Sequence, residues 1–336
     1  MLRIIAYHRV AEVIDTPGID PRSVSATPQG FAAQMSHLAR HYRVVSMPDV
    51  LEALAKRRAL PKRSVLITFD DGYADFADIA WPILVGLRLP ATLFVATAYP
   101  GNPARSFWWD MLYRAVLRTS RDELLDTPAG TLPLRTIAER RQSLRVLQDC
   151  VPALPHAAAM GLVNSWCSQL GGTNDSKSNV LTWDRLRQLV KQGLTLGSHT
   201  RTHPILTQLP PTEIREEIRG AQRDLEREIG LALPIFCYPN GNHNDVVCNI
   251  AREEGIAFAV TTLSKPNHLS SADLLRLGRI VITPRTTLPI FSVRLLRLGA
   301  YLDSWRHRTP AVTVPQPPSL DPCQSALSQQ SFQVPK

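Results

Sequence analysis

Short apolar, β-rich runs alternate with amphipathic helical patterns along most of this 336-residue chain, and this alternation is the strongest constraint on its fold. Strands that alternate with helices are typical of βα units around a parallel sheet, and about eight units suit a closed barrel. An open doubly wound sheet is the alternative, but no GxGxxG motif follows any of the predicted strands. The eight predicted strands are Arg3–His8, Tyr42–Ser46, Ser64–Asp70, Ala91–Thr97, Leu194–His199, Ile235–Pro239, Ala257–Thr262 and Leu277–Ile282.

The helices between these strands carry recognisable start and stop signals. Thr27 and Pro28 form a cap followed by a proline in the first turn, and they predict a helix to about Arg40. Further helices end at glycines, which favour the left-handed conformation found after helices. They are predicted at 183–192, 211–229 and 245–254.

Two segments interrupt the alternation. Residues 106–180 contain no convincing strand, so we predict a mostly helical insertion there, within a barrel that spans residues 1–305. Residues 309–336 are rich in Pro, Ser and Gln and poor in large apolar side chains, which predicts a disordered tail.

The chain carries a formal net charge of +9, and 44% of its residues are hydrophobic. Basic residues gather at 56–63 and 285–308, which indicates either a solvated basic face or a peripheral contact with an anionic membrane. No motif of a nucleic-acid-binding module accompanies the charge, so we expect no nucleic-acid partner. The sequence does not indicate an oligomeric state.

Five cysteines without a CxxC pair suit a reducing compartment. The apolar run Ile4–Ala6 is too short for a signal peptide, and no run is long enough for a transmembrane helix. These features predict a cytoplasmic protein, with the inner membrane face as the place of any peripheral contact.

The stretch LITFDDGY ends a buried strand in two adjacent carboxylates, Asp70 and Asp71. Neighbouring carboxylates raise each other's pKa and are costly to bury, so a bound divalent metal would relieve their repulsion. The carboxyl ends of barrel strands are also where active sites of such folds are built. The alternative is a turn that caps a helix running from Tyr73 to Leu87.

A second strand end carries the partners that a metal would need. His199 and His203 are four residues apart in the stretch GSHTRTHP, which is a ligand spacing for Zn²⁺ or a similar ion. Two histidines and one aspartate leave positions open for water and substrate, as catalytic sites do.

The stretches FDDG and HTRTH together resemble the first two motifs of the NodB-homology polysaccharide deacetylases, carbohydrate esterase family 4. The resemblance implies an α/β fold, a distorted (β/α)₇ TIM-like barrel. It also implies that Asp70 is the general base and that Asp71, His199 and His203 hold a divalent metal. Zn²⁺ is our expectation from these ligands, and Co, Ni, Mn or Fe are the alternatives.

The stretch FCYPNG lies where the family has its third motif, which typically reads FRPPYG. Cys237 replaces the arginine that usually partners the base, and Asn240 replaces the tyrosine whose backbone N–H contributes to the oxyanion hole. Asn240 can still donate its own N–H. Arg279 is our candidate to supply the missing charge from a neighbouring strand, and Arg201 is the alternative.

The late Leu-x-His motif that supplies the family's general acid is not visible in this chain. His8 closes the first strand instead, which resembles exopolysaccharide deacetylases whose acid histidine lies near the N-terminus. We therefore predict His8 as the general acid, against the alternative of a packed or surface histidine. His243 is the reserve candidate, and His268 fits poorly.

The resulting hypothesis is a metal-dependent hydrolase that removes acetyl groups, most simply N-acetyl groups, from an amino-sugar-containing substrate. That substrate would be an oligosaccharide, a polysaccharide or a lipid-linked saccharide. One alternative is a deacetylase or amidohydrolase of a non-sugar small molecule. The other is a non-catalytic relic that binds metal and sugar, which the missing arginine of the third motif suggests.

Overall fold

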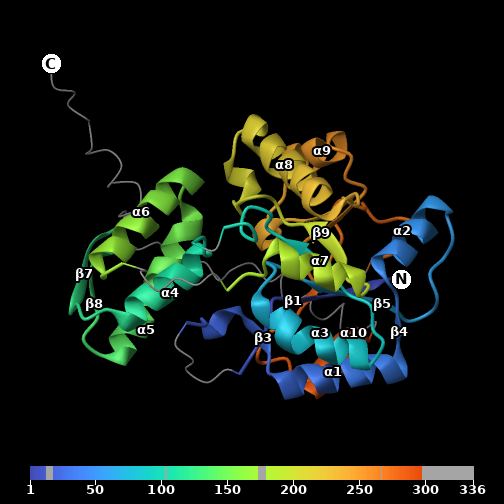
Figure 1. The fold of residues 1–336 in the computed structure, drawn as a ribbon, viewed down its shortest axis with the longest axis horizontal. Coiled ribbons are helices and arrows are strands. Elements are labelled where there is room, and N and C mark those ends of the chain that lie inside the picture. The colour runs from blue at the N-terminus through green and yellow to red at the C-terminus, as the bar shows by residue number, and fades with distance from the viewer. Residues whose placement is uncertain (13–17, 103, 173–178, 266, 297–336) are drawn as a thin grey trace, which may run out of the picture. The chain divides into compact units, whose positions relative to one another are not determined.

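A computed structural model describes residues 1–12, 18–102, 104–172, 179–265 and 267–296, and it separates them into two compact units (Figure 1). The second unit consists of residues 18–20 and 107–172, and the first contains the others. The tail predicted at 309–336 lies outside the described residues.

The first unit is built around an eight-stranded sheet in which every strand pair is parallel. Its order is β11-β10-β9-β6-β5-β1-β12, with β4 beside β5. All eight predicted strands are present, although most are shorter than expected. They are β1 (Arg3–Tyr7), β4 (Arg43–Val44), β5 (Ser64–Phe69), β6 (Thr92–Val95), β9 (Thr195–Ser198), β10 (Ile235–Cys237), β11 (Phe258–Val260) and β12 (Ile280–Val281).

One segment near the end of the chain joins the two edges of this sheet. Leu277 forms a parallel bridge with Val260 of β11, and three residues later Ile280 pairs with Ile5 of β1. The backbone N–H of Leu277 donates to Ala259 at 3.0 Å. The sheet therefore curls on itself instead of staying open, which confirms the predicted barrel-like α/β architecture.

Local capping explains several helices around this sheet. The hydroxyls of Thr27 and Thr182 accept hydrogen bonds from N–H groups of the first turns of α1 (Pro28–His41) and α7 (Trp183–Lys191). Gly230 ends α8 (Pro211–Ile229) with a φ of 82°, a conformation that favours glycine. The other described α-helices of this unit are α2 (Met47–Ala55), α3 (Trp81–Gly86), α9 (Asp245–Glu253) and α10 (Leu288–Leu295).

The helix considered between Tyr73 and Leu87 is present from 74 to 86, but its middle is not a regular α-helix. Ala74 and Asp75 are α-helical, a π-helical turn, η2 (Phe76–Ala80), follows them, and α3 begins after it at Trp81. Pro82 lacks an N–H and its ring crowds the carbonyl four residues earlier, so a wider turn before it relieves the clash.

The core beneath the carboxyl ends of β1 and β5 is aromatic. Tyr7 and Phe69 lie on the neighbouring strands β1 and β5 and stack with ring centroids 5.3 Å apart. Phe31 of α1 meets both rings edge to face, and Phe76 packs on Phe69 at 4.8 Å. These buried rings fix the strand ends from which His8 and Asp70 follow.

The second unit has its own apolar core, which includes Leu112, Leu147 and Trp166. It contains α4 (Trp108–Arg118), α5 (Ile137–Cys150) and α6 (His156–Gln169), together with the short η3 (Val151–Ala153). It also contains an antiparallel hairpin of β7 (Glu123–Thr127) and β8 (Gly130–Pro133), so the expectation of no strand between 106 and 180 was wrong. The only buried side chains of these strands, Leu124 and Leu132, face each other across the pair. One buried residue per strand leaves no alternation of apolar and polar residues that would predict the hairpin.

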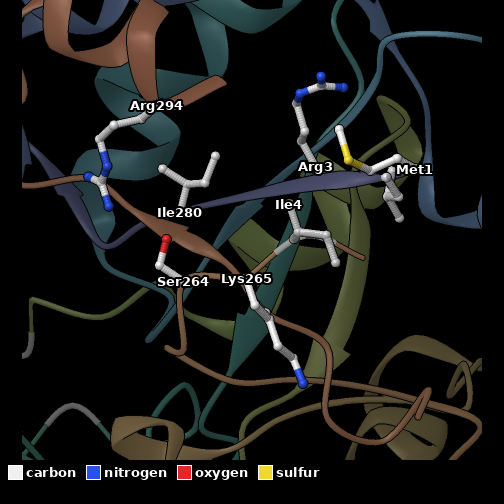
Figure 2. A pocket seen from close by; sticks show the side chains of 9 residues that line it. Met1, Arg3, Ile4, Ser264, Lys265, Ile280 and Arg294 are labelled. Atoms are coloured by element: carbon white, nitrogen blue, oxygen red, sulfur yellow. The ribbon is translucent and has the colours of Figure 1, made fainter. Parts of the chain in front are cut away.

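A small cavity lies at the amino-terminal ends of β1 and β12 (Figure 2). The side chains of Arg3, Lys265 and Arg294 around it point in different directions and do not converge on one point. Arg3 and Arg294 instead bond the backbone carbonyls of Leu295 and Val281. We therefore assign the cavity no ligand.

Among the described helices, none has the length and apolar character needed to cross a bilayer.

Candidate active site

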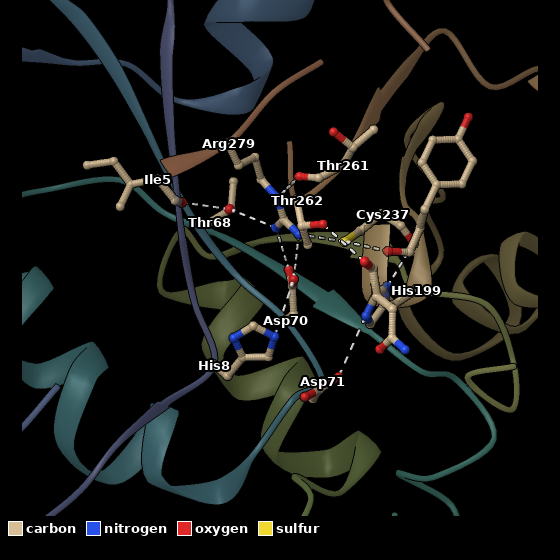
Figure 3. Close-up of polar contacts among 12 residues, drawn as sticks. Ile5, His8, Thr68, Asp70, Asp71, His199, Cys237, Thr261, Thr262 and Arg279 are labelled. Carbon is tan, nitrogen blue, oxygen red and sulfur yellow. Dashed lines mark hydrogen bonds and ion pairs between the residues drawn. The ribbon is translucent and has the colours of Figure 1, made fainter. Parts of the chain in front are cut away.

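Polar side chains gather at the carboxyl ends of the strands of the first unit. His8 follows β1, Asp70 and Asp71 follow β5, and His199 follows β9. Because parallel strands end at the same edge of a sheet, residues far apart in the sequence meet there. Figure 3 shows Asp70 between Arg279 and His8, with Asp71 directed toward His199.

Arg279, just before β12, is fully buried and makes five hydrogen bonds, one for each N–H of its guanidinium. Its Nη1 and Nη2 donate to the two carboxylate oxygens of Asp70 at 2.8 and 2.7 Å. The other acceptors are Thr261 O at 2.8 Å, Thr68 Oγ1 at 3.2 Å and Cys237 Sγ at 3.2 Å. Arg279 therefore meets Asp70 as the sequence suggested, and Cys237 occupies part of the space around it.

The charge state of Asp70 follows from this pairing. Burial alone would raise the pKa of Asp70, but the charge and hydrogen bonds of Arg279 outweigh it and hold that pKa well below its ordinary value. Asp70 is therefore ionised at neutral pH. An ionised carboxylate is what proton abstraction from water requires.

His8 lies next to Asp70, with its Nε2 3.9 Å from Asp70 Oδ2. Its backbone N–H donates to Ser25 Oγ at 2.9 Å, which helps to fix the turn after β1. The His8 side chain is 33% exposed whereas Asp70 is 2% exposed, so the imidazole is the more accessible group to an incoming molecule. Burial lowers the pKa of His8, and the charge of Asp70 partly offsets this effect.

Asp71, His199 and His203 form a second cluster beside Asp70. Asp71 Oδ1 lies 3.6 Å from Nε2 of His199 and 3.5 Å from Nε2 of His203. Two ligands that each lie about 2.0–2.1 Å from one tetrahedral ion are roughly 3.3 Å apart. The distances and the donor types therefore both fit a single divalent metal held by these three residues.

The ring orientation of His199 also fits metal binding. Its Nδ1 lies 2.7 Å from the carbonyl oxygen of Cys237, and a carbonyl can only accept, so Nδ1 carries the proton. Nε2 is then left with its lone pair toward Asp71, as a ligating histidine requires. Burial lowers the pKa of His199 to about 4, which keeps the ring neutral at neutral pH.

Asp70, His199 and Cys237 are a second group whose ligand atoms lie close together. Both oxygens of Asp70 already accept hydrogen bonds from Arg279. Burial raises the pKa of the Cys237 thiol well above its ordinary value, so a thiolate ligand is disfavoured. The cluster of Asp71, His199 and His203 is therefore the better metal site.

Glycine at 197 lets β9 bring its histidine into place. A Cβ atom at Gly197 would lie 2.6 Å from the ring of Phe94 and 2.9 Å from Ile235. These side chains belong to the neighbouring strands β6 and β10, so β9 fits between them only with glycine at this position. Two residues later, the N–H of His199 donates to Val95 O at 2.9 Å.

Asn240 lies in the short turn η5 (Pro239–Gly241) after β10. It adopts a left-handed φ of 55°, and its carbonyl accepts a hydrogen bond from Thr262 Oγ1 at 3.0 Å. Gly241 follows with a φ of 75°, and a Cβ there would collide with Thr262. The turn is therefore tightly fixed, and the oxyanion role of the Asn240 N–H stays a prediction.

The alternative candidates have other contacts. Arg201 bonds Asp224, with Nε 3.0 Å from Oδ2, so it is not the partner of Asp70. His243 Nδ1 lies 2.8 Å from Gly241 O, and its ring stacks on Tyr238. His268 bonds Ser271 and Ala272 through its carbonyl, in the loop before β12.

Thr68 and Thr261 complete the surroundings of Arg279 and were not predicted from the sequence. Thr68 Oγ1 donates to Ile5 O at 2.7 Å, which leaves its oxygen to accept from Arg279. Thr68 precedes Asp70 by two residues on a strand, so the two lie on the same face. That spacing is the one signal that would have found it.

A model of the polysaccharide deacetylase family matches residues 57–125 and 156–259, just over half of the chain. The chain belongs to the polysaccharide deacetylase family. Asp70, Asp71, His199 and His203 lie inside the matched segments, as does Asn240. His8 and Arg279 lie outside them.

One relative is the poly-β-1,6-N-acetyl-D-glucosamine N-deacetylase of Escherichia coli (strain K12), which is 30% identical over 101 residues. That match covers 30% of this chain and 14% of the E. coli protein.

Two solved structures share the fold of this family member. The first is the Streptococcus pyogenes deacetylase PplD in complex with acetate, with a TM-score of 0.57 and 20% identity, covering 87% of this chain and 96% of PplD. The second is IcaB from Ammonifex degensii, with a TM-score of 0.56 and 20% identity, covering 90% of this chain and 97% of IcaB. Both likenesses support the curled parallel sheet described above.

Proposed function

We propose that this family member is a metal-dependent hydrolase that removes N-acetyl groups from an amino-sugar-containing saccharide. The observation that carries the proposal is the pair of adjacent carboxylates in two different environments. Asp70 is held ionised by Arg279, and Asp71 lies 3.5–3.6 Å from two histidine nitrogens. One carboxylate is therefore suited to proton transfer, and its neighbour is suited to metal binding.

In this proposal, Asp71, His199 and His203 hold a divalent ion, with Zn²⁺ the expected metal. When bound, such an ion would act as a Lewis acid on the acetyl carbonyl and its attacking water. Both histidine rings are kept neutral by burial, which lowers the pKa of His203 well below its ordinary value as it lowers that of His199. The apo protein is thus poised to ligate without first losing protons.

Asp70 accepts the proton of the attacking water in the first step. Arg279 keeps the carboxylate ionised and fixes its orientation through two bonds, so the base cannot rotate away. The N–H of Asn240 is proposed to donate to the oxygen that becomes negative in the tetrahedral intermediate.

His8 is proposed to protonate the departing sugar amine in the second step. Its Nε2 lies 3.9 Å from Asp70 Oδ2, so the base and the acid lie next to each other. An amine is a poor leaving group unless it gains a proton, and a positioned histidine supplies it. Acetate and a free amino sugar are the products.

The relic hypothesis loses its motivation in this structure. It depended on the replacement of the third-motif arginine by Cys237. Arg279 supplies a guanidinium to Asp70 from another strand, at 2.7–2.8 Å. The base therefore retains its charged partner.

The test is acetate release from a panel of N-acetylated and O-acetylated saccharides, together with acetylated amines that are not sugars. Release from saccharides by the Zn²⁺-loaded wild type, and none by Asp70→Asn, would support the proposal. Release only from the non-sugar amines would replace it with the small-molecule amidohydrolase. No release from any substrate by protein that holds metal would reject the deacetylase.

A peripheral contact with an anionic membrane is a separate proposal. The basic residues Lys56, Arg57, Arg58, Lys62 and Arg63 are exposed between α2 and β5. They precede β5, at the opposite end of that strand from Asp70, so the catalytic edge would face away from the bilayer. Sedimentation with phosphatidylserine vesicles but not phosphatidylcholine vesicles, lost at high salt, would support it.

A further inference from the structure

The loop that carries both metal-site histidines is bonded by a carboxylate from a neighbouring helix. Glu217 of α8 accepts hydrogen bonds at Oε2 from the backbone N–H groups of Arg201, at 2.7 Å, and Thr202, at 2.9 Å. Its Oε1 accepts the hydroxyl of Thr202 at 2.6 Å. One side chain thus makes three hydrogen bonds to the two residues before His203.

The backbone of this loop needs such support. Thr200 has a φ of 64° and His203 a φ of 62°. Both backbones are therefore left-handed, a conformation that residues other than glycine rarely adopt. Each such residue costs on the order of 1–3 kcal/mol unless the surroundings hold it. Glu217 accepts its hydrogen bonds from Arg201 and Thr202, which lie between the two strained residues.

A second contact to the same loop is distinct from this one. The side chain of Arg201 crosses α8 at Gly220, where a Cβ atom would lie 2.3 Å from Arg201 Cδ, and it bonds Asp224. The Arg201 side chain is 40% exposed and its partner Asp224 is buried, so this ion pair is partly screened and ties down the side chain of Arg201. Glu217 therefore differs from Arg201 in acting on the backbone of the loop, next to His203.

We propose that Glu217 is a positioning residue of the metal site, which holds His203 at the distance from Asp71 that one ion requires. The proposal rests on the metal set named under the proposed function. Glu217 lies outside that set and does not contact the reacting atoms. Its loss would let the loop relax from its left-handed residues and would move the His203 ring away from Asp71.

Two substitutions of Glu217 separate the effect of its charge from the effect of its hydrogen bonds. Glu217→Gln keeps an oxygen that can accept the same two N–H bonds, and its amide can donate to the Thr202 hydroxyl. Glu217→Ala removes all three bonds. Glu216→Ala is a matched control, because Glu216 is the preceding residue of the same helix and only approaches the Arg201 side chain, at 3.9 Å.

The experiment measures Zn²⁺ affinity of the metal-free full chain by competition with a chromophoric chelator, with circular dichroism as the check of folding. We expect Glu217→Ala to bind Zn²⁺ about 10–100-fold more weakly than the wild type, as for other residues that orient metal ligands. Glu217→Gln should recover most of the affinity, and Glu216→Ala should bind as the wild type does. Turnover of Glu217→Ala should return toward the wild-type value at saturating Zn²⁺.

Each other outcome would overturn the proposal in a recognisable way. Wild-type affinity in folded Glu217→Ala would reject Glu217 as a positioning residue while leaving the metal site intact. A wild type that binds no Zn²⁺ would reject the metal set itself, and the proposal with it. If Glu217→Ala does not fold, Thr202→Val removes one of the three bonds. Undiminished Zn²⁺ affinity in that variant would then count against the proposal.

Discussion

The guanidinium of Arg279 bonds both carboxylate oxygens of Asp70, through Nη1 at 2.8 Å and Nη2 at 2.7 Å, across 209 positions of sequence. Both groups are buried, so neither can be solvated if the other is lost. The pair therefore links the start of β12 to the proposed base.

Replacing Arg279 by Gln should lower the free energy of unfolding by about 3–5 kcal/mol, because it leaves the Asp70 charge buried without its partner. Chemical denaturation with urea measures the change. Arg276→Gln is the control, since Arg276 is paired with exposed or half-exposed carboxylates and should cost at most about 1 kcal/mol. Equal losses in the two variants would contradict the stabilising role of the buried pair.

The adjacent carboxylates should respond differently to the same substitution. Asp70→Asn should lower kcat by roughly 10²–10⁴-fold, because the base is lost, and should keep Zn²⁺ binding. Asp71→Asn should weaken Zn²⁺ binding itself, because an anionic ligand is lost. Calorimetric titration with Zn²⁺ and acetate release separate the two effects, and similar Zn²⁺ affinities in both variants would exclude Asp71 as a ligand.

His8→Gln should impair amide hydrolysis far more than hydrolysis of an aryl acetate. A sugar amine needs a proton to leave, and we expect a loss of roughly 10²–10⁴-fold. The phenolate of 4-nitrophenyl acetate leaves without one, so its hydrolysis should change little. Equal losses on both substrates would mean that His8 has another role, such as substrate binding.

Removal of the metal should lower both activity and thermal stability. A ligand that binds only the folded state at 100 times its Kd adds about 2.7 kcal/mol. Dialysis against a chelator should therefore abolish acetate release and lower Tm, and added Zn²⁺ should restore both. A double variant of His199→Ala and His203→Ala is the control, and a similar Zn²⁺-dependent rise of its Tm would place the metal elsewhere.

The cysteines of the second unit should differ in reactivity with pH. Burial raises the pKa of the Cys167 thiol to about 11, whereas Cys150 is only half-buried. Thiolate is the reactive form, so alkylation of Cys167 should be slow at pH 8 and should rise with pH toward 11. Mass spectrometry after iodoacetamide treatment at several pH values measures this. Rapid labelling of Cys167 at pH 8 would show that the helices around it open readily.

The sequence allowed the barrel to be predicted because its strands repeat one strong pattern. Each is a short apolar run followed by polar residues. Those polar ends, together with the family motifs, made Asp70, Asp71, His199 and His203 candidates, and the structure brings them together. The pairing of Arg279 with Asp70 was a correct expectation, although Arg201 was also considered. The structure separates the two, because Arg201 bonds Asp224 on α8.

Other features depend on tertiary contacts that the amino-acid sequence alone does not reveal. The π-turn before Trp81 follows from crowding by Pro82, and the strands of the hairpin at 123–133 bury only Leu124 and Leu132. Glu217 was missed because its role comes from the packing of α8 against the histidine loop. On its own helix, it is one of several acidic residues with nothing to set it apart.

During synthesis, Asp70 is made long before its partner Arg279, so the pair can form only late. Synthesis produces His8 and Asp70 early, His199 and His203 later, and Arg279 only when the segment with β12 emerges. Until then, Asp70 has no buried cation to face, and the edges of the sheet cannot be joined through Leu277 and Ile280. A nascent chain that stops short of Arg279 should therefore be catalytically silent, and activity should appear as one late event when the barrel closes.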